Sequence, residues 1–514
     1  MVGGAIIVAW LAGLALLVKR EYFRPRTERL AEAASRVSPG VVYYGVMQGE
    51  QQIGFASSTI DTTTSSIAIH DYFVADIPVG GKARRSAARM NVTLTRAMRM
   101  TDFDFELLTD SAPLVAKGQI SGDSLLVLSI ASGNAKPDTQ RVVVTGPILL
   151  PTTVPLALAL ADVPKVGKHY EMPMFNPASM AANTVSFDVQ AESSFVVNDS
   201  AEFDSTSKRW RGIRPTPLHA WQINAKSIAG FNGWIDEQGR IVQTSQLGFV
   251  LRRLPYEIAF DNWRAARRAR AASVPQDRDI LETTAIAANK KLSGRVSSLR
   301  VRLSGAPLAD FDLNGLRQRF SGDTLSITEE PASTLATTRA LPMDARDPKD
   351  ARPEPLIQSG DPRIIRLART IKGKETNARV VAERLNRWVH DSLKKQITFG
   401  IPSAIQVLET RSGDCNEHTQ LFVALARAVG LPARIAAGLA FVDGKFFYHA
   451  WPEILLDDWV AVDPTFGQFP ADAAHLRFVI GGVARQTELV RLMGNLKIDV
   501  LSVNDAPAGS AARR

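Results

Sequence analysis

The sequence contains a single cysteine, Cys415, among its 514 residues. One thiol excludes any intramolecular disulfide, and this count fits either redox compartment. His418 lies three positions after Cys415, but no second pair of ligands follows at zinc-like spacing. We therefore expect no metal site and no cofactor.

The sequence also lacks a concentrated basic tract. The chain has 61 Lys and Arg residues against 52 Asp and Glu residues, but the surplus is not gathered into a tract interleaved with aromatic residues. The densest basic run is Arg264, Arg267, Arg268 and Arg270, which is typical of a solvated helix or linker. Nucleic acid is therefore not expected as a partner.

Long uninterrupted apolar runs are scarce, and residues 2–18 form the one that could cross a membrane. Seventeen residues are near the lower limit for a membrane-spanning helix. No basic residue precedes the run and no small-x-small cleavage site follows it, so we expect an uncleaved transmembrane anchor. Residues 148–161 are also apolar, but Pro151 and Pro155 interrupt them and make a second span improbable.

The length predicts several domains, because one core rarely grows beyond about 250–300 residues. Period-two alternation recurs between residues 41 and 263, which predicts a large antiparallel β domain. The remaining divisions we expect are a small β-rich segment at 279–330, an α+β catalytic domain at 355–490 and a disordered tail at 504–514.

Cys415 lies where a glycine-containing turn meets a predicted helix. The apolar positions Leu421, Phe422, Leu425 and Val429 fall on one helical stripe. A thiol in the first turn of a helix feels the positive end of the helix dipole, which favours the thiolate. The pattern favours a nucleophile over an inert core thiol.

A histidine and an aspartate follow on predicted strands. Asp443-Gly444 indicates a hairpin, whose return strand carries His449, and the next strand ends at Asp463. A thiolate can attack a carbonyl, an imidazole can move the proton, and a carboxylate can hold the imidazole tautomer. The Cys415 backbone N–H is the candidate donor to an oxyanion.

For Cys415, His449 and Asp463 to act together, the loop at Asp457-Asp458 must have a particular length. A regular two-residue turn would place His449 and Asp463 on opposite faces of the sheet, because side chains alternate along a strand. We therefore predict an odd-length loop or a bulge between these strands.

The same residues resemble the core of the transglutaminase-like superfamily of papain-like thiol enzymes. The resemblance covers residues 355–490 and is carried by these motifs: Gly413-Asp414-Cys415-Asn416-Glu417-His418, Tyr448-His449-Ala450-Trp451-Pro452-Glu453, Val462-Asp463-Pro464-Thr465 and the run from Ala424 to Arg434. It implies Cys415 as the nucleophile, His449 as the base and Asp463 as the orienting acid. It implies a cysteine protease or amidase, or an acyltransferase that crosslinks proteins.

We expect hydrolysis of amide bonds in a peptide or protein substrate. The alternatives are acyl transfer to an amine through the same thioester, and a non-catalytic binding or scaffold role. Five basic residues after the anchor would keep that side cytoplasmic by the positive-inside rule. Domains of this family on such anchors are commonly extracytoplasmic, and we expect a periplasmic soluble part.

Other residues near the motif have simpler interpretations. His418 is expected to be structural, and His475 is a weaker candidate for lining the site. Trp451 and Trp459 are expected in sheet packing, and Asp414 as a helix cap.

Overall fold

The computed structural model describes residues 37–505, apart from 111, 123, 134, 145, 162, 177–180, 226–230, 247, 269–277, 293, 316, 331–334 and 336–337. Residues 2–18, the expected anchor, and most of the expected tail lie outside this range. Within the described part of the chain, no helix has the length and apolarity needed to cross a membrane.

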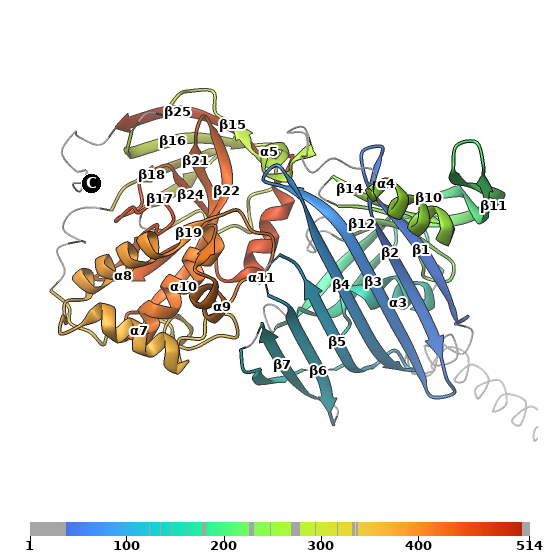
Figure 1. Ribbon diagram of the computed structural model, residues 1–514, viewed down its shortest axis with the longest axis horizontal. Coiled ribbons are helices and arrows are strands. Elements are labelled where there is room, and N and C mark those ends of the chain that lie inside the picture. Colours follow the sequence, from blue (N-terminus) through green and yellow to red (C-terminus); the bar gives the residue numbers. More distant parts are fainter. Residues whose placement is uncertain are drawn as a thin grey trace, which may run out of the picture.

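The N-terminal half forms one antiparallel sheet of 14 strands (Figure 1). Its strands are β1 (Gly40–Gln48), β2 (Gln51–Thr62), β3 (Ser66–Val79), β4 (Lys82–Thr95), β5 (Met100–Leu108), β6 (Leu114–Ser121), β7 (Leu125–Ser132), β8 (Asp138–Val143), β9 (His169–Asn176), β10 (Ala181–Asp204), β11 (Arg209–Ala225), β12 (Phe231–Asp236), β13 (Ile241–Gln246) and β14 (Phe249–Leu254). The strand order runs from β8 back to β1, which pairs with β14, and then from β14 back to β9. The expected large antiparallel domain is confirmed.

The sheet is strongly curved, because strands far apart in its order share one core. Buried side chains of β2–β7 and of β9–β12 pack around the short helices η1 (Pro151–Thr153) and α3 (Val154–Ala161). Pro151 begins η1 and Pro155 is the second residue of α3, and these two short segments fill the hollow of the sheet. The opposite face is covered by η2 (Glu257–Asn262) and α4 (Trp263–Arg268), where Trp263 packs on Phe55 and Val74.

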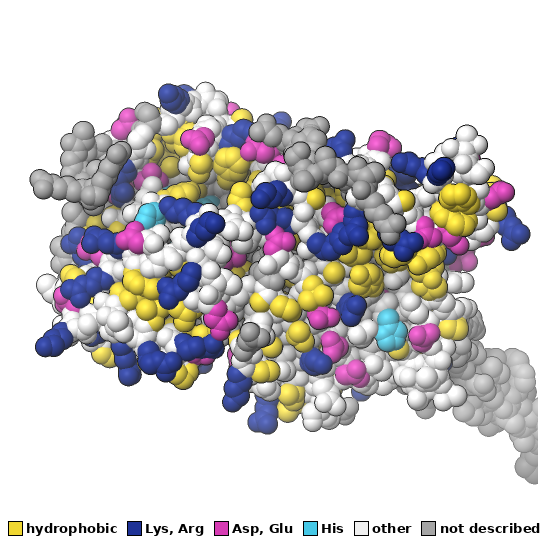
Figure 2. All heavy atoms as spheres, in the orientation of Figure 1, with side chains coloured by type: hydrophobic (Ala, Val, Ile, Leu, Met, Phe, Trp, Pro, Cys, Tyr) yellow, Lys and Arg dark blue, Asp and Glu magenta, His cyan; other side chains and the backbone are white. Residues whose placement is uncertain are grey.

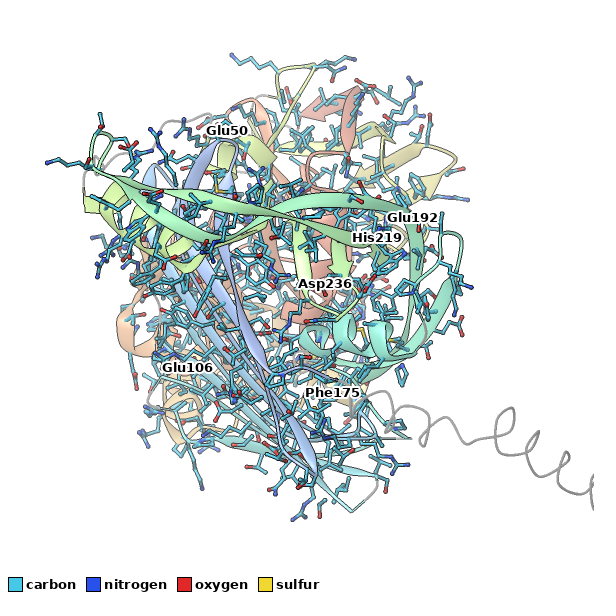
Figure 3. The ribbon with its side chains drawn as sticks, turned by 90° about the vertical axis from the view of Figure 1, so that its right-hand side faces the viewer. Glu50, Glu106, Phe175, Glu192, His219 and Asp236 are labelled. Carbon is cyan, nitrogen blue, oxygen red and sulfur yellow. The ribbon has the colours of Figure 1, made fainter. Side chains whose placement is uncertain are left out.

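The long β10–β11 hairpin crosses one side of this domain (Figure 3). Glu192 and His219 lie near each other on its two strands, with 3.8 Å between Glu192 Oε2 and His219 Nε2.

The C-terminal half has a sheet between helices and a second sheet. The central sheet contains β15 (Ile286–Ala287), β22 (Lys445–Leu455), β21 (Ala433–Val442), β24 (His475–Ile480) and β23 (Trp459–Ala461). The helices are α5 (Ile280–Thr284), η4 (Pro348–Asp350), α7 (Pro362–Lys372), α8 (Ala378–Ser392), α9 (Ala404–Thr410), α10 (Cys415–Ala428), α11 (Val483–Gln486) and η5 (Thr487–Arg491). Buried side chains of α7–α10 pack on β21 and β22 in one core.

The second sheet corrects one expected boundary. Its strands are β17 (Gln318–Ser321), β18 (Thr324–Thr328), β16 (Val296–Ser304) and β25 (Lys497–Asp505). The segment 279–330 is therefore completed by β25, and its side chains share a core with β21, β22 and β24. The expected start of the tail at Asn504 is too early, because β25 pairs with β16 up to Asp505.

The two halves lie side by side (Figure 1), and the tip of the β3–β4 hairpin contacts the C-terminal half. The Gly81 N–H donates to Asp279 Oδ2 over 2.5 Å. A Cβ atom on Gly80 would lie 2.9 Å from Ile397 Cδ1, and Phe399 packs on the cluster that contains Val79. On the face in Figure 2, Lys and Arg side chains are spread among Asp and Glu over both halves.

Candidate active site

Cys415 is the first residue of α10, as the sequence indicates. Asp414 caps the helix: its carboxylate accepts the Asn416 N–H at 3.0 Å, and the Glu417 carboxylate accepts the Asp414 N–H at 3.0 Å. Gly413 is needed here, because a Cβ atom on it would lie 2.2 Å from Glu417 Cγ. The expected role of Asp414 as a cap is confirmed.

A neighbouring loop holds this cap from the other side. The Gln396 N–H donates to the Gly413 carbonyl at 3.0 Å, and the Thr398 hydroxyl donates to Glu417 Oε1 at 2.6 Å. This is the loop whose Ile397 contacts the β3–β4 hairpin. The start of α10 is therefore connected to the N-terminal sheet through one loop.

The protonation of Cys415 differs from the expectation. Burial raises the pKa of the Cys415 thiol, the carboxylates of Asp414, Glu417 and Asp463 raise it further, and a hydrogen bond with the Ala450 backbone only partly opposes them. The helix dipole was expected to favour the thiolate, but burial first and the neighbouring acidic side chains second shift the pKa of Cys415 upward instead. The direction of this shift favours the thiol form of Cys415 over the thiolate.

The loop between β22 and β23 has the odd length that a Cys–His–Asp triad would require. Leu455 pairs with Trp459, so three residues form the loop, and Glu453 pairs with Ala461. In this register Asp463 falls opposite Trp451, two residues from His449 on the same strand face. The prediction of an odd-length loop is confirmed.

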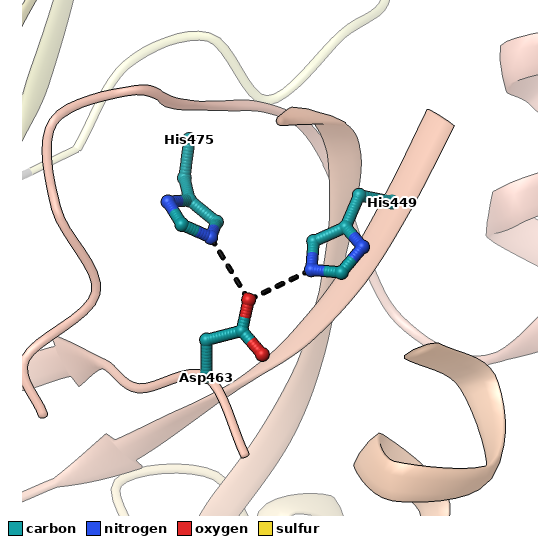
Figure 4. A group of neighbouring side chains, drawn as sticks. All are labelled: His449, Asp463 and His475. Carbon is teal, nitrogen blue, oxygen red and sulfur yellow. Dashed lines mark hydrogen bonds and ion pairs between the residues drawn. The ribbon is translucent and has the colours of Figure 1, made fainter. Parts of the chain in front are cut away.

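His449 and Asp463 are hydrogen-bonded and buried. His449 Nε2 lies 2.7 Å from Asp463 Oδ2 (Figure 4). The second oxygen, Oδ1, accepts the Thr465 N–H at 2.7 Å and the Phe466 N–H at 3.0 Å. Burial raises the pKa of Asp463, but its hydrogen bonds and charge contacts with His449 and His475 outweigh this and hold it well below its usual range. Asp463 is therefore an ionised acceptor.

The position of Cys415 relative to His449 follows from the packing of α10 on β22. The Thr419 hydroxyl, one turn after Cys415, donates to the Ala450 carbonyl at 3.1 Å. Cys415 itself packs with the core cluster that contains Ala450. The helix start therefore lies beside the strand segment that carries His449.

Aromatic rings fix the plane of the His449 imidazole. Phe466 stacks on it with ring centroids 4.6 Å apart and an interplanar angle of 4°. Trp451 is fully buried and lies 6.1 Å away on the same strand. Trp459 instead packs beneath the Arg434 guanidinium at 3.9 Å, so both tryptophans take part in sheet packing as expected.

His475 is a member of the site that the sequence indicated only weakly. Its Nε2 lies 3.0 Å from Asp463 Oδ2, and its Nδ1 lies 3.0 Å from Asp472 Oδ1 (Figure 4 shows the first contact). Burial lowers the pKa of His475, but the hydrogen bonds with Asp463 and Asp472 outweigh it and raise this pKa to about 9. Asp472 was not anticipated at all, although its place three residues before His475 was the available signal.

His418 points elsewhere. Its Nδ1 lies 2.6 Å from the Asp414 carbonyl, and burial lowers its pKa. Its Nε2 has no hydrogen-bond partner among the described residues. His418 thus packs inside the helix start, as a structural residue would.

His449, Asp463 and His475 are also the described residues with atoms close enough for a metal ion, within 4.8 Å of one another. Asp463 Oδ2 already accepts hydrogen bonds from both rings, and the carboxylate is fully buried. These contacts account for the three side chains as a hydrogen-bonded network, and we assign no metal to them.

The arrangement is a thiol at a helix start that packs beside the strand carrying an imidazole–carboxylate pair, on an α+β core. A family model of the transglutaminase-like superfamily matches residues 365–464, a range that contains Cys415, His449 and Asp463. The C-terminal third of the chain therefore contains a transglutaminase-like domain. A comparison with curated proteins found no match.

Solved structures give weaker likenesses. A candidate cysteine protease from Cytophaga hutchinsonii has 18% identity and a TM-score of 0.28, over 41% of this chain and 89% of that one. A β-barrel-like protein of a domain family of unknown function from Brucella abortus has 13% identity and a TM-score of 0.29, over 43% and 96%. The periplasmic domain of TgpA from Pseudomonas aeruginosa has 18% identity and a TM-score of 0.23, over 34% and 75%. At these scores we base no argument on them.

Proposed function

We propose that this protein is a membrane-anchored cysteine hydrolase of the transglutaminase-like type, which cleaves amide bonds in a peptide or protein. The observation that carries the proposal is the hydrogen bond between His449 Nε2 and Asp463 Oδ2 beside the start of α10. Because an ionised carboxylate only accepts, the His449 proton lies on Nε2 and the lone pair on Nδ1. Nδ1 is then the atom that can take the thiol proton.

The reaction has two halves. Cys415 Sγ attacks the amide carbonyl carbon while its proton moves to His449 Nδ1. The tetrahedral oxyanion forms at the helix start, where the Cys415 N–H is the candidate donor. His449 returns the proton to the leaving nitrogen as the C–N bond breaks, which leaves a thioester.

Water resolves the thioester. His449 Nδ1 takes a proton from the attacking water and returns it to sulfur, which releases a carboxylic acid and the free thiol. Asp463 stays ionised and stabilises the transient imidazolium. If a primary amine takes the place of water, the same intermediate gives an amide crosslink.

The setting we propose rests on the sequence. Residues 2–18 would anchor the chain in a membrane, with the soluble part on the extracytoplasmic side. The curved sheet would then separate the enzyme from the membrane and hold it in position.

The test uses the full chain in detergent with a peptide library. Products are identified by mass spectrometry with and without a primary amine. We expect amide cleavage that Cys415→Ala and His449→Ala abolish. His169→Ala is the matched control, because His169 is an exposed histidine that also bonds an aspartate, Asp188, at 2.7 Å.

Amine incorporation without cleavage would replace hydrolysis by acyl transfer as the reaction. Full activity in Cys415→Ala would overturn the proposal altogether. A phosphatase reporter fused after Arg514 tests the topology, since it is active only outside the cytoplasm.

A further inference from the structure

Both ring nitrogens of His475 contact carboxylate oxygens. Nε2 lies 3.0 Å from Asp463 Oδ2 and Nδ1 lies 3.0 Å from Asp472 Oδ1. His475 is 1% exposed. A neutral imidazole has one N–H and one lone pair, so it could satisfy only one of these two acceptors.

The hydrogen bonds of the two carboxylates indicate that both are ionised. Asp472 accepts the Ala474 N–H at 3.1 Å besides the His475 contact, and its pKa lies below the usual value because the contacts with His475 outweigh burial. Asp463 accepts two backbone N–H groups and the His449 ring. Neither acid has a described contact that would require it to donate a proton.

We propose that His475 is a permanent imidazolium, a positioning residue that holds Asp463 and offsets part of its charge so that His449 rests neutral. This inference rests on the proposed function, since it assigns a role within the same thiol site. The triad would then extend to a chain from Cys415 through His449, Asp463 and His475 to Asp472.

The charge count around the site explains why this arrangement suits a thiol nucleophile. Asp472, His475 and Asp463 together carry one negative charge, whereas the two acids alone would carry two. A single charge is enough to orient His449 and to stabilise its imidazolium in the transition state. A second would favour the cationic form of His449 at rest, and a cation cannot accept the Cys415 proton.

The groups that face His475 are few. Among the described residues, Asp463, Asp472 and His449 are the titratable ones in contact, and the ring centroids of Trp451 and Phe466 lie 5.1 and 5.9 Å from that of His475. The nearby carboxylate Glu453 is already paired with Arg477. The raised pKa of His475, about 9, agrees with the charge that the contacts require.

The first test measures the protonation of the His475 ring directly by NMR and does not depend on enzymatic activity. The full chain, labelled with 15N-histidine, has only seven histidines. We expect one buried ring that keeps two N–H protons from pH 6 to pH 8 and that is absent from His475→Gln. If no buried histidine of the native protein is doubly protonated at pH 7, the inference is wrong.

The second test reads the effect on His449. In His475→Gln the site gains one net negative charge, so the acidic limb of the pH profile of kcat/KM should move up by about one pH unit. A purely structural role would lower kcat or stability and leave the limb in place. His169→Gln, which removes an exposed histidine bonded to Asp188, should leave the profile unchanged.

The outcomes separate the two proposals. An unmoved limb in a folded His475→Gln protein overturns the positioning role while the hydrolase proposal stands. If His475→Gln does not fold, the NMR titration of the native protein decides. If Cys415→Ala stays active, the proposed function fails, and the doubly protonated ring still decides the charge of His475.

Discussion

Asp463 Oδ2 accepts hydrogen bonds from two imidazoles at once, from His449 Nε2 at 2.7 Å and from His475 Nε2 at 3.0 Å. One carboxylate oxygen therefore orients both imidazole rings of the site. This sharing determines which atoms of His449 can do chemistry, since it fixes the proton on Nε2 and leaves Nδ1 available for Cys415.

The first prediction concerns Asp463→Asn. The asparagine amide would offer either its NH2 group or a weaker oxygen acceptor to the Nε2 atoms of His449 and His475. The proton of His449 would then no longer be held on Nε2. We expect kcat/KM for a peptide amide to fall by about 10²–10⁴. Asp458→Asn, in the exposed loop where Asp458 pairs with Arg346, is the control and should retain activity. Equal loss in both variants would count against the orienting role.

The second prediction concerns the reactivity of Cys415. Because burial and the nearby carboxylates raise the pKa of Cys415, alkylation by iodoacetamide should be slow near neutral pH. Its rate should increase tenfold per pH unit to beyond the free-thiol value of about 8.5. The urea-unfolded chain supplies the reference thiol, since no other cysteine is present. A rate that is flat between pH 5 and 7 would indicate a resident thiolate instead.

The third prediction concerns the buried ion pairs of Glu453. Its carboxylate contacts Arg477 at 2.9 Å and Arg434 at 2.6 Å, and it is 2% exposed. Glu453→Gln leaves the buried Arg477 guanidinium and the partly exposed Arg434 guanidinium without this charge partner, and it should lower the free energy of unfolding by about 3–5 kcal/mol in urea titrations. Glu409→Gln, whose partner Arg363 is exposed, should cost less than about 1 kcal/mol.

Ionisation of the Glu453 carboxylate makes the stabilisation from its two ion pairs depend on pH. Burial raises the pKa of Glu453, but the two arginines outweigh burial and hold it below its usual value. A lowered pKa in the folded state means that the stabilisation is present above the unfolded value of about 4.3 and is lost as pH falls below it. The difference in stability between the native chain and Glu453→Gln should therefore shrink on acidification.

The fourth prediction concerns Asp71 in the N-terminal sheet. This residue lines a cavity of about 290 Å³ between the sheet and η1, and burial raises its pKa to about 6. The folded state then binds more protons than the unfolded chain between pH 4 and 6, so stability falls as pH rises through that window. Asp71→Asn should be more stable at pH 7 by on the order of 1–3 kcal/mol in thermal unfolding, whereas exposed Asp61→Asn should be neutral.

Local features of the site were predictable from sequence because they depend on neighbours along the chain. Asp414 caps α10, and Asp443-Gly444 forms the two-residue turn between β21 and β22. The odd length of the loop after Leu455 was predictable because side chains alternate along a strand and His449 and Asp463 were assumed to lie on the same face of the sheet.

Features that depend on distant segments were not predictable. His475 meets Asp463 only because β24 pairs with β21 and returns the chain to the site. β25 pairs with β16 across about 200 residues, which no local pattern indicates. The raised pKa of Cys415 depends on burial by packing that the helix position alone does not reveal.

The loop at residues 396–399 has a consequence for which length of the chain should be assayed. It contacts the cap of the Cys415 helix through Thr398 and the β3–β4 hairpin through Ile397. A shortened protein that begins near residue 279 would keep Cys415, His449, Asp463 and the second sheet, but it would lose the β3–β4 hairpin and expose one side of this loop to solvent. In such a fragment, the loop that contacts the start of the Cys415 helix would lack its contact with the N-terminal sheet. Inactivity of the fragment would therefore not count against activity of the intact chain.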